Sequence, residues 1–236
     1  MKLRTTPIRI PAEGIWLDAT LAHAPDVRGL VLILQPGSNP ILHQRQALVA
    51  GALQRAGFAT LALDLLNHQE ELHDPDARYN VTRLTDRLLA AALWIENQPP
   101  LCDLSIGLLA FGTASAAIVR AAAKNPERFN TLVCLGGRPD LAGAGPLRNV
   151  GVPTLFVVGH DDPERAILRS AFELLKSTRA WQDAGQMDNG VASLDMLQRS
   201  AAFATEWMLR HLPLPSPKMV DPTLPHSQDE VPPNPV

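Results

Sequence analysis

The chain is poor in the features that mark membrane, secreted and nucleic-acid-binding proteins. Its 236 residues hold 21 Lys and Arg against 24 Asp and Glu, so no basic excess is present to bind nucleic acid or an acidic membrane surface. No apolar run reaches about 18 residues, and the N-terminal stretch MKLRTTPIRIPAEG lacks the apolar segment of a signal peptide. We therefore expect a cytoplasmic protein with neither nucleic acid nor a membrane as a partner.

Cysteine and recognisable metal motifs are equally scarce. Cys102 and Cys134 are too few for a disulfide framework. Because both fall in or beside predicted strands, we expect buried, reduced thiols. The polar segment NHQEELHDPD has no recognised ligand spacing and is interpreted as a solvated loop, although it contains His68, Glu70, Glu71, His73 and Asp74. The sequence gives no reason to expect a metal or a cofactor.

What the sequence does contain is an alternation of apolar runs and longer segments of helical period, which is typical of a parallel sheet wrapped by helices. We predict an α/β fold with helices on both faces. The first two strands precede any helix and are expected to form an antiparallel edge. The expected strands are 7–10, 14–21, 30–34, 59–63, 105–110, 131–135 and 154–158, and the expected helices are 42–56, 81–97, 113–124, 163–176 and 192–212.

The last 24 residues differ in composition from the rest. PLPSPKMVDPTLPHSQDEVPPNPV (213–236) holds eight of the 21 prolines and shows no helical or strand period, so it cannot build a core. We predict one domain over residues 1–212, followed by an extended proline-rich tail. The tail is either a flexible end or a segment that contacts a protein partner or another copy of the chain.

Four stretches carry a resemblance to the α/β-hydrolase fold, specifically to small proteins related to dienelactone hydrolases. They are GLVLILQPGSN (29–39), ATLALDLL (59–66), IGLLAFGTASAA (106–117), and GGRPDLAG (136–143) together with VPTLFVVGHDDP (152–163). The resemblance covers residues 7–212. It implies a catalytic triad in the chain order nucleophile, acid, histidine, with the nucleophile in a G-x-S-x-G or G-x-C-x-G turn.

The nucleophile that the resemblance implies is missing. The turn aligns as Ala110-Phe111-Gly112-Thr113-Ala114, so glycine stands where serine or cysteine is expected. The nucleophile position is normally strained, and glycine adopts such a conformation at little steric cost. The small flanking residues still allow the sharp turn, and Gly112 is interpreted as the apex of a turn that has lost its reactive atom.

The acid is present, with two readings of its role. Asp162 matches the position of the triad acid, and Asp161 is an adjacent candidate. An Asp just before a helix that begins near Pro163 is also a good helix cap, so both roles stay open.

The histidine of the triad is expected in the loop QDAGQMDNG (182–190), which contains none. Gln186 or Met187 occupies roughly the matching position. Of the later histidines, His226 lies in the tail, and His211 is interpreted as a cation near the C-terminal end of the last helix.

Three other side chains are weaker candidates for the lost chemistry. Ser115 lies nearly one helical turn beyond Gly112, on roughly the same face but displaced from the mouth of the site. His160 is a substitute base two residues before Asp162, although neighbours at one strand end rarely point at the same atom. Cys134 ends the next strand and is a remote alternative.

The backbone donors of an oxyanion hole are altered as well. The loop after the first parallel strand contains Pro36, which has no N–H to donate. Gly37 or Ser38 from this loop, and Thr113 after the apex, are the remaining donors for an anion-binding crevice. The helix that starts near Thr113 adds its positive end.

Two classes of function follow. The favoured hypothesis is a catalytically inactive α/β-hydrolase homologue that serves as a binding or interaction protein, with a small molecule in the vestigial crevice or a partner at the tail. Losing residues of a working triad costs on the order of a millionfold in turnover. The alternative is an esterase or lactonase with a rearranged site that uses Asp162 and a substitute such as Ser115.

Overall fold

The computed structural model describes residues 3–38, 40–187 and 192–215. One eight-stranded sheet runs through the domain in the order β1-β2-β4-β3-β5-β6-β7-β8. The strands are β1 Arg4–Ala12, β2 Ile15–His23, β3 Leu30–Gln35, β4 Ala59–Asp64, β5 Ile106–Phe111, β6 Thr131–Leu135, β7 Thr154–Val158 and β8 Arg179–Asp183. From β4 to β8 every neighbouring pair is parallel, which confirms the predicted α/β class. Most of the predicted tail, residues 216–236, lies outside the described residues.

The antiparallel edge that the sequence predicts is formed by β1 and β2. β1 starts three residues earlier and ends two residues later than predicted. β2 ends two residues later than predicted and starts one residue later, because Gly14 lies in the turn. Glu13 and Gly14 join them as a two-residue hairpin loop with positive φ values of 48° and 79°. This is the backbone that a tight hairpin needs, and glycine at the second position makes it accessible. β2 then pairs antiparallel with β4, so the hairpin extends the parallel sheet at one margin.

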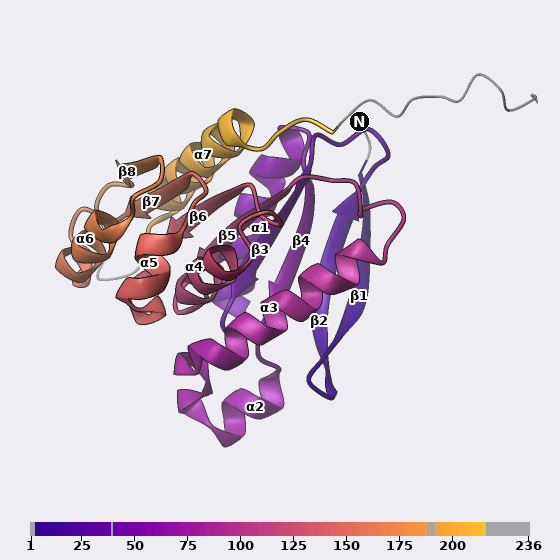
Figure 1. The fold of residues 1–236 in the computed structure, drawn as a ribbon, viewed down its shortest axis with the longest axis horizontal. Coiled ribbons are helices and arrows are strands. Elements are labelled where there is room, and N and C mark those ends of the chain that lie inside the picture. The colour runs from indigo at the N-terminus through magenta and orange to yellow at the C-terminus, as the bar shows by residue number, and fades with distance from the viewer. Residues whose placement is uncertain (1–2, 39, 188–191, 216–236) are drawn as a thin grey trace, which may run out of the picture.

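Helices cover both faces of the sheet (Figure 1). α3 Val81–Glu96 packs against α4 Ala114–Lys124 on one face, and α1 Pro40–Arg55 packs against α7 Leu194–His211 on the other. The remaining helices are α2 His68–His73, α5 Ala144–Asn149 and α6 Arg165–Leu174, with short 3₁₀ turns at η1 Pro75–Tyr79 and η2 Pro139–Ala142. No helix in the described part of the chain is long and apolar enough to cross a membrane.

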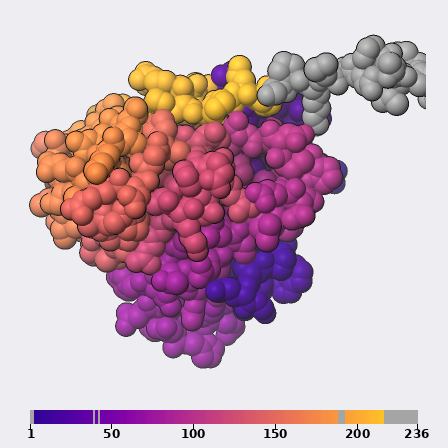
Figure 2. All heavy atoms as spheres, viewed as in Figure 1, coloured from indigo at the N-terminus to yellow at the C-terminus, as the bar shows by residue number. Residues whose placement is uncertain are grey.

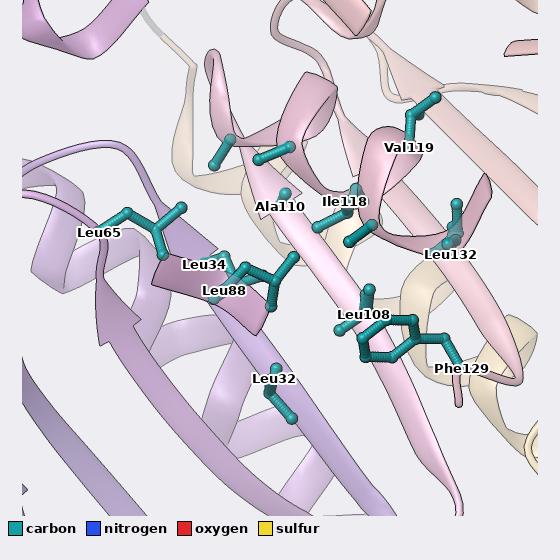
Figure 3. Close-up of a cluster of buried hydrophobic side chains, with 14 of the residues drawn as sticks. Leu32, Leu34, Leu65, Leu88, Leu108, Ala110, Ile118, Val119, Phe129 and Leu132 are labelled. Carbon is teal, nitrogen blue, oxygen red and sulfur yellow. The ribbon is translucent and has the colours of Figure 1, made fainter. Parts of the chain in front are cut away.

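Two apolar clusters, one on each face of the sheet, hold the layers together. Strands buried on both faces explain the unbroken apolar runs of the sequence. The larger cluster joins β3, β5 and β6 to α3 and α4; Figure 3 shows Leu34, Leu88, Leu108, Ile118 and Phe129 pointing toward one another. Alternate residues of the same strands, such as Ile33 and Leu109, belong to the second cluster beneath α1 and α7.

The hairpin lies at the margin of this packed body. In Figure 2 the magenta to orange segments cover the visible face, and indigo atoms of the N-terminal strands show along one side. Alternate residues of β1 and β2 are exposed along the strands. One face of the hairpin is therefore free of helix cover.

Three predictions about elements need correction. β8 is missing from the predicted strands because RAWQD is a short, half-exposed edge strand without an apolar run. The segment predicted as a solvated loop forms α2, because Asn67 and Glu70 make a reciprocal capping box at its start. Cys102 is exposed in the turn after α3, whereas Cys134 is buried in β6 as predicted.

Candidate functional site

The turn between β5 and α4 lies at the carboxyl edge of the parallel strands, and Gly112 is its apex. Gly112 has a φ of +55°, the left-handed conformation that glycine adopts without a side-chain clash. Its carbonyl oxygen accepts hydrogen bonds from Ser115 N at 3.2 Å and Arg138 N at 3.1 Å. The strand, the sharp turn and the helix of a nucleophile elbow are thus all present, and the reactive side chain is absent.

Backbone and a proline ring occupy the surroundings of Gly112. A Cβ atom added to Gly137 would lie 2.2 Å from the Gly112 carbonyl oxygen, so only glycine fits at that position. A Cβ atom added to Gly112 itself would meet Pro36 Cγ at 3.4 Å, an ordinary contact. Space for a side chain therefore exists at the apex, but φ is unfavourable for any residue other than glycine.

Among the expected oxyanion donors, the Ser38 N–H has a partner inside the protein. Ser38 N–H donates to Glu71 Oε2 at 2.8 Å, and the Glu71 carboxylate lies so close to Gly37 that a Cβ there would be 2.0 Å from Oε1. The hydroxyl of Thr113 donates to the Arg78 carbonyl. The anion position beside Ser38 is therefore filled by a carboxylate of the chain, carried on α2.

Asp162 lies close to the same edge, three residues before α6 begins at Arg165. Its Oδ1 accepts from Glu164 N–H at 2.8 Å, and its Oδ2 would be 3.7 Å from a Cβ on Gly136, the residue after β6. Asp161 accepts from Met187 N–H at 2.8 Å and so ties the loop after β7 to the loop after β8. The helix-cap role that the sequence suggests for Asp162 is wrong, because the N-cap of α6 is Glu164 and the Asp162 carboxylate accepts from the N–H of that residue, in the turn before the helix. No histidine contacts the Asp162 carboxylate among the described residues.

The position expected for the triad histidine carries no base. Gln186 is exposed, and Met187 is half-buried. The Met187 side chain packs on Gly159, where its Cγ would be 3.3 Å from an added Cβ. Residues 188–190 of the predicted loop lie outside the described residues.

The substitute candidates are separated from one another. His160 Nδ1 lies 3.1 Å from Asp183 Oδ2, so the imidazole pairs with the end of β8 and not with Asp162. Ser115 is fully buried, and its hydroxyl donates to the Gly136 carbonyl at 3.3 Å. Burial raises the pKa of the Cys134 thiol to about 12, and the nearby Ser115 hydroxyl only partly opposes this. Within the described part of the chain, no base lies within hydrogen-bond distance of Ser115 or Cys134.

His211 is the last residue of α7. Burial, together with the adjacent Arg210, lowers the pKa of its imidazole, which disfavours the charged form that the sequence predicts. The ring centroid of His211 lies 4.0 Å from that of Trp207, one helical turn earlier.

One polar cluster beside the site was not expected. Gln35 Nε2 donates to Asp64 Oδ1 at 2.6 Å, His43 Nε2 lies 2.7 Å from Asp64 Oδ2, and Ser38 Oγ lies 3.5 Å from the same Nε2. The sequence carries a signal for this cluster: Gln35 and Asp64 are polar residues at the ends of two buried apolar strands. Because the carboxyl ends of adjacent parallel strands meet at one edge of the sheet, the two side chains can be expected to lie close together.

Metal binding gains no support from the side chains. In the described ranges, no three His, Cys, Asp or Glu residues converge as a metal site requires. In α2, the His73 ring contacts the Gln69 carbonyl, and Glu70 binds Arg87. These groups are engaged in local structure.

Comparison with known proteins agrees with this architecture. A dienelactone hydrolase from Anabaena variabilis is similar over 90% of this chain and 100% of its own, with 29% sequence identity and a TM-score of 0.83. Est1E from Butyrivibrio proteoclasticus shares the fold at 14% identity and a TM-score of 0.72, over 86% of this chain and 98% of its own. No protein-family model matches the chain.

A longer relative is also found by sequence. A Mycobacterium tuberculosis protein named "Putative phosphoribosyl transferase" is 30% identical over 227 residues, which are 91% of this chain and 48% of the relative. The chain thus spans about half the length of that relative. Both kinds of relative align along about nine-tenths of this chain.

Proposed function

The chain has the α/β-hydrolase fold of dienelactone hydrolase-like proteins, and from this premise we propose that it binds a ligand or a partner without hydrolysing one. The observation that carries the proposal is Gly112 at the apex of the elbow, with φ of +55° and no side-chain oxygen or sulfur. Acyl transfer needs a nucleophile activated by an adjacent base. Neither group is present at its expected place.

The occupied oxyanion position supports the same proposal. A hydrolase keeps backbone donors directed at the oxygen that becomes negative in the transition state. Here the Ser38 N–H already binds the Glu71 carboxylate at 2.8 Å. An ester carbonyl would have to displace a charged acceptor from this donor, so stabilisation of a developing oxyanion is opposed by the protein itself.

The rearranged hydrolase remains a second candidate, because His43 Nε2 lies within hydrogen-bond distance of both Ser38 Oγ and Asp64 Oδ2. Their geometry argues against a working triad. Ser38 and Asp64 both approach Nε2 of His43, whereas a triad uses one ring nitrogen for the nucleophile and the other for the acid. In this tautomeric arrangement Nε2 cannot donate to the carboxylate and also accept the serine proton.

The proposal also covers the cellular location and the partners of the protein. We infer a cytoplasmic protein whose residues 213–236 contact a protein partner or another copy of the chain, because the proline-rich composition suits extended recognition segments. The phosphoribosyl transferase activity in the name of the longer relative is not part of the proposal, since the chain spans only 48% of that protein.

Turnover of small esters and lactones tests the proposal. We expect the purified chain to hydrolyse p-nitrophenyl acetate and dihydrocoumarin no faster than the heat-unfolded chain at equal concentration. Asp162→Asn and Asp64→Asn should leave this background unchanged. Saturable turnover above it would contradict the proposal, and its loss in either variant would establish the rearranged hydrolase and identify its acid.

A further inference from the structure

A cavity of about 940 Å³ lies between α1 and the uncovered face of β1, β2 and β4. It exists because the side chains on this face are small. Strand alternation places Thr60, Ala62 and Asp64 of β4 on the side of α1, next to Asp18 and Thr20 of β2. No helix covers the hairpin here, so the hollow stays open beside the packed core.

Several side chains in the walls of the cavity present hydrogen-bonding groups that carry no charge. Gln46 Nε2 donates to the Ile33 carbonyl at 2.9 Å, and Gln54 Nε2 donates to Thr60 Oγ1 at 2.8 Å. Each amide has therefore used one donor within the protein and keeps its carbonyl oxygen as an acceptor. The threonine hydroxyls of the floor both donate and accept.

Asp64 is the most buried charged residue of the cavity lining. Its carboxylate is held by Gln35 Nε2 and His43 Nε2. Gln35 itself is fully buried and does not line the cavity. Because two carboxylate oxygens accept more hydrogen bonds than these two groups supply, Asp64 can also accept from a ligand hydroxyl.

Charge decides which ligands fit. At the rim, Arg9 and Asp18 form an exposed ion pair with no net charge. The remaining carboxylate of the lining is that of Asp64, which is buried. A phosphate or a carboxylate beside Asp64 would be repelled. Uncharged hydroxyl groups can donate to Asp64 and to the glutamine oxygens at once.

We propose that this cavity binds an uncharged, hydroxyl-rich small molecule of the sugar or polyol class, with its hydroxyl groups on Asp64 and the glutamine oxygens. The inference rests on the proposed function, since it names the ligand of a protein that binds without hydrolysis. The volume lies within the range of small-molecule sites, about 300 to 1,000 Å³, and accommodates a mono- or disaccharide. The lost elbow is not part of this site.

Nuclear magnetic resonance of the ¹⁵N-labelled full chain tests the proposal. D-ribose, D-glucose and sucrose are titrated, with ribose 5-phosphate and gluconate as anionic counterparts. We expect at least one uncharged probe to shift the amide resonances of Thr20, Gln54 and Thr60, and the anionic probes to bind at least about tenfold more weakly, a difference of about 1.4 kcal/mol.

Two matched variants, each with tryptophan in place of an exposed alanine, locate the binding. Ala47 is exposed on α1 and lines the cavity, and Ala202 is exposed on α7. Ala47→Trp fills the hollow and should abolish the shifts, whereas Ala202→Trp should retain them. Asp64→Asn removes the buried charge and should weaken binding about tenfold, and its folded spectrum is compared with that of the wild type.

Several results would overturn the proposal. These are no shift of the cavity resonances with any uncharged probe at millimolar concentration, tighter binding of ribose 5-phosphate, or shifts that persist in Ala47→Trp. A change of oligomeric mass in Ala47→Trp alone, measured by light scattering, would show that the face contacts another copy of the chain. Hydrolysis of esters would contradict the non-hydrolytic role separately and would leave the cavity titration readable.

Discussion

At the scale of single residues, the chain combines an intact backbone turn with an absent reactive atom. The φ of +55° at Gly112 is the conformation that a nucleophile holds under strain in this kind of turn. With glycine in that place the strain is relieved, and the turn is kept for the packing of Gly137 and Arg138 against its carbonyl group.

Restoring the side chain should therefore cost stability. We expect Gly112→Ser to lower the free energy of unfolding by about 1 to 3 kcal/mol, because serine must adopt a left-handed φ. Urea unfolding at equilibrium measures this. The matched control is Gly145→Ser in α5, where φ is not positive and no atom lies within 4 Å of an added Cβ. Equal stability of Gly112→Ser and the wild type would show that Gly112 does not hold this conformation.

The two thiols should differ in reactivity by burial alone. Cys102 is exposed, whereas Cys134 is buried and its pKa is raised to about 12. The thiolate is the reactive form, so Ellman's reagent should titrate one thiol in the native protein and two in guanidinium chloride. Cys102→Ser should abolish the native signal. Rapid reaction of Cys134 in that variant would contradict the buried, protonated state.

At the scale of elements, a buried arginine joins α2 and the hairpin to α3. Arg87 of α3 is 2% exposed. It donates to Glu70 of α2 at 2.8 Å and to the Leu65 carbonyl at 2.7 Å, and its Nε lies 3.4 Å from Glu13 at the hairpin tip. Because α2 also carries Glu71, this ion pair holds in place the carboxylate that fills the oxyanion position.

The pair predicts a pH-dependent stability. Hydrogen bonds from Arg87 hold the pKa of Glu70 below its ordinary value of 4.5, although burial opposes them. A carboxylate with a lowered folded pKa contributes stability that is present above pH 4.5 and is lost as the pH falls through the folded pKa. We expect Glu70→Gln to cost about 1 to 3 kcal/mol at pH 7. The urea midpoints of the two proteins should converge in acid.

Glu173→Gln is the matched control for this experiment. Glu173 pairs with Arg169 on the exposed face of α6, with both side chains more than half exposed. Such a pair contributes roughly 0.3 to 0.5 kcal/mol. If the free energy of unfolding falls by the same small amount in both variants at pH 7, the ion pair of Arg87 with Glu70 stabilises the fold no more than this exposed pair does.

Elements with a run of apolar residues could be predicted from the sequence, whereas two elements without one, β8 and α2, could not. Strands β3 to β7 could be predicted because each is a run of buried apolar residues bounded by turn residues. β8 could not, because an edge strand with the sequence RAWQD needs no such run. α2 was hidden for a different reason: its stability comes from the Asn67 capping box and the Arg87 ion pair, a local and a tertiary contact without an apolar stripe.

At the scale of the whole molecule, the sheet brings the loops after β3, β5, β6, β7 and β8 to one edge. The resemblance to α/β-hydrolases implied that the loops of Gly112, Asp162 and Gln186 lie at the same edge. It was not enough to show that Glu71 binds Ser38 N–H or that His160 pairs with Asp183, because these contacts join segments 33 and 23 residues apart. The cavity beside α1 depends on the missing helix cover of the hairpin, which no local pattern encodes.

The most direct test of the non-hydrolytic role is the intact mass of the full chain after incubation with a fluorophosphonate, which labels activated serines irrespective of substrate. An esterase of the same fold is labelled in parallel to verify the reagent. We predict no adduct on this chain and complete labelling of the esterase. Stoichiometric modification that peptide mapping assigns to Ser38, Ser115 or another serine would contradict the proposal and identify the nucleophile of a rearranged hydrolase.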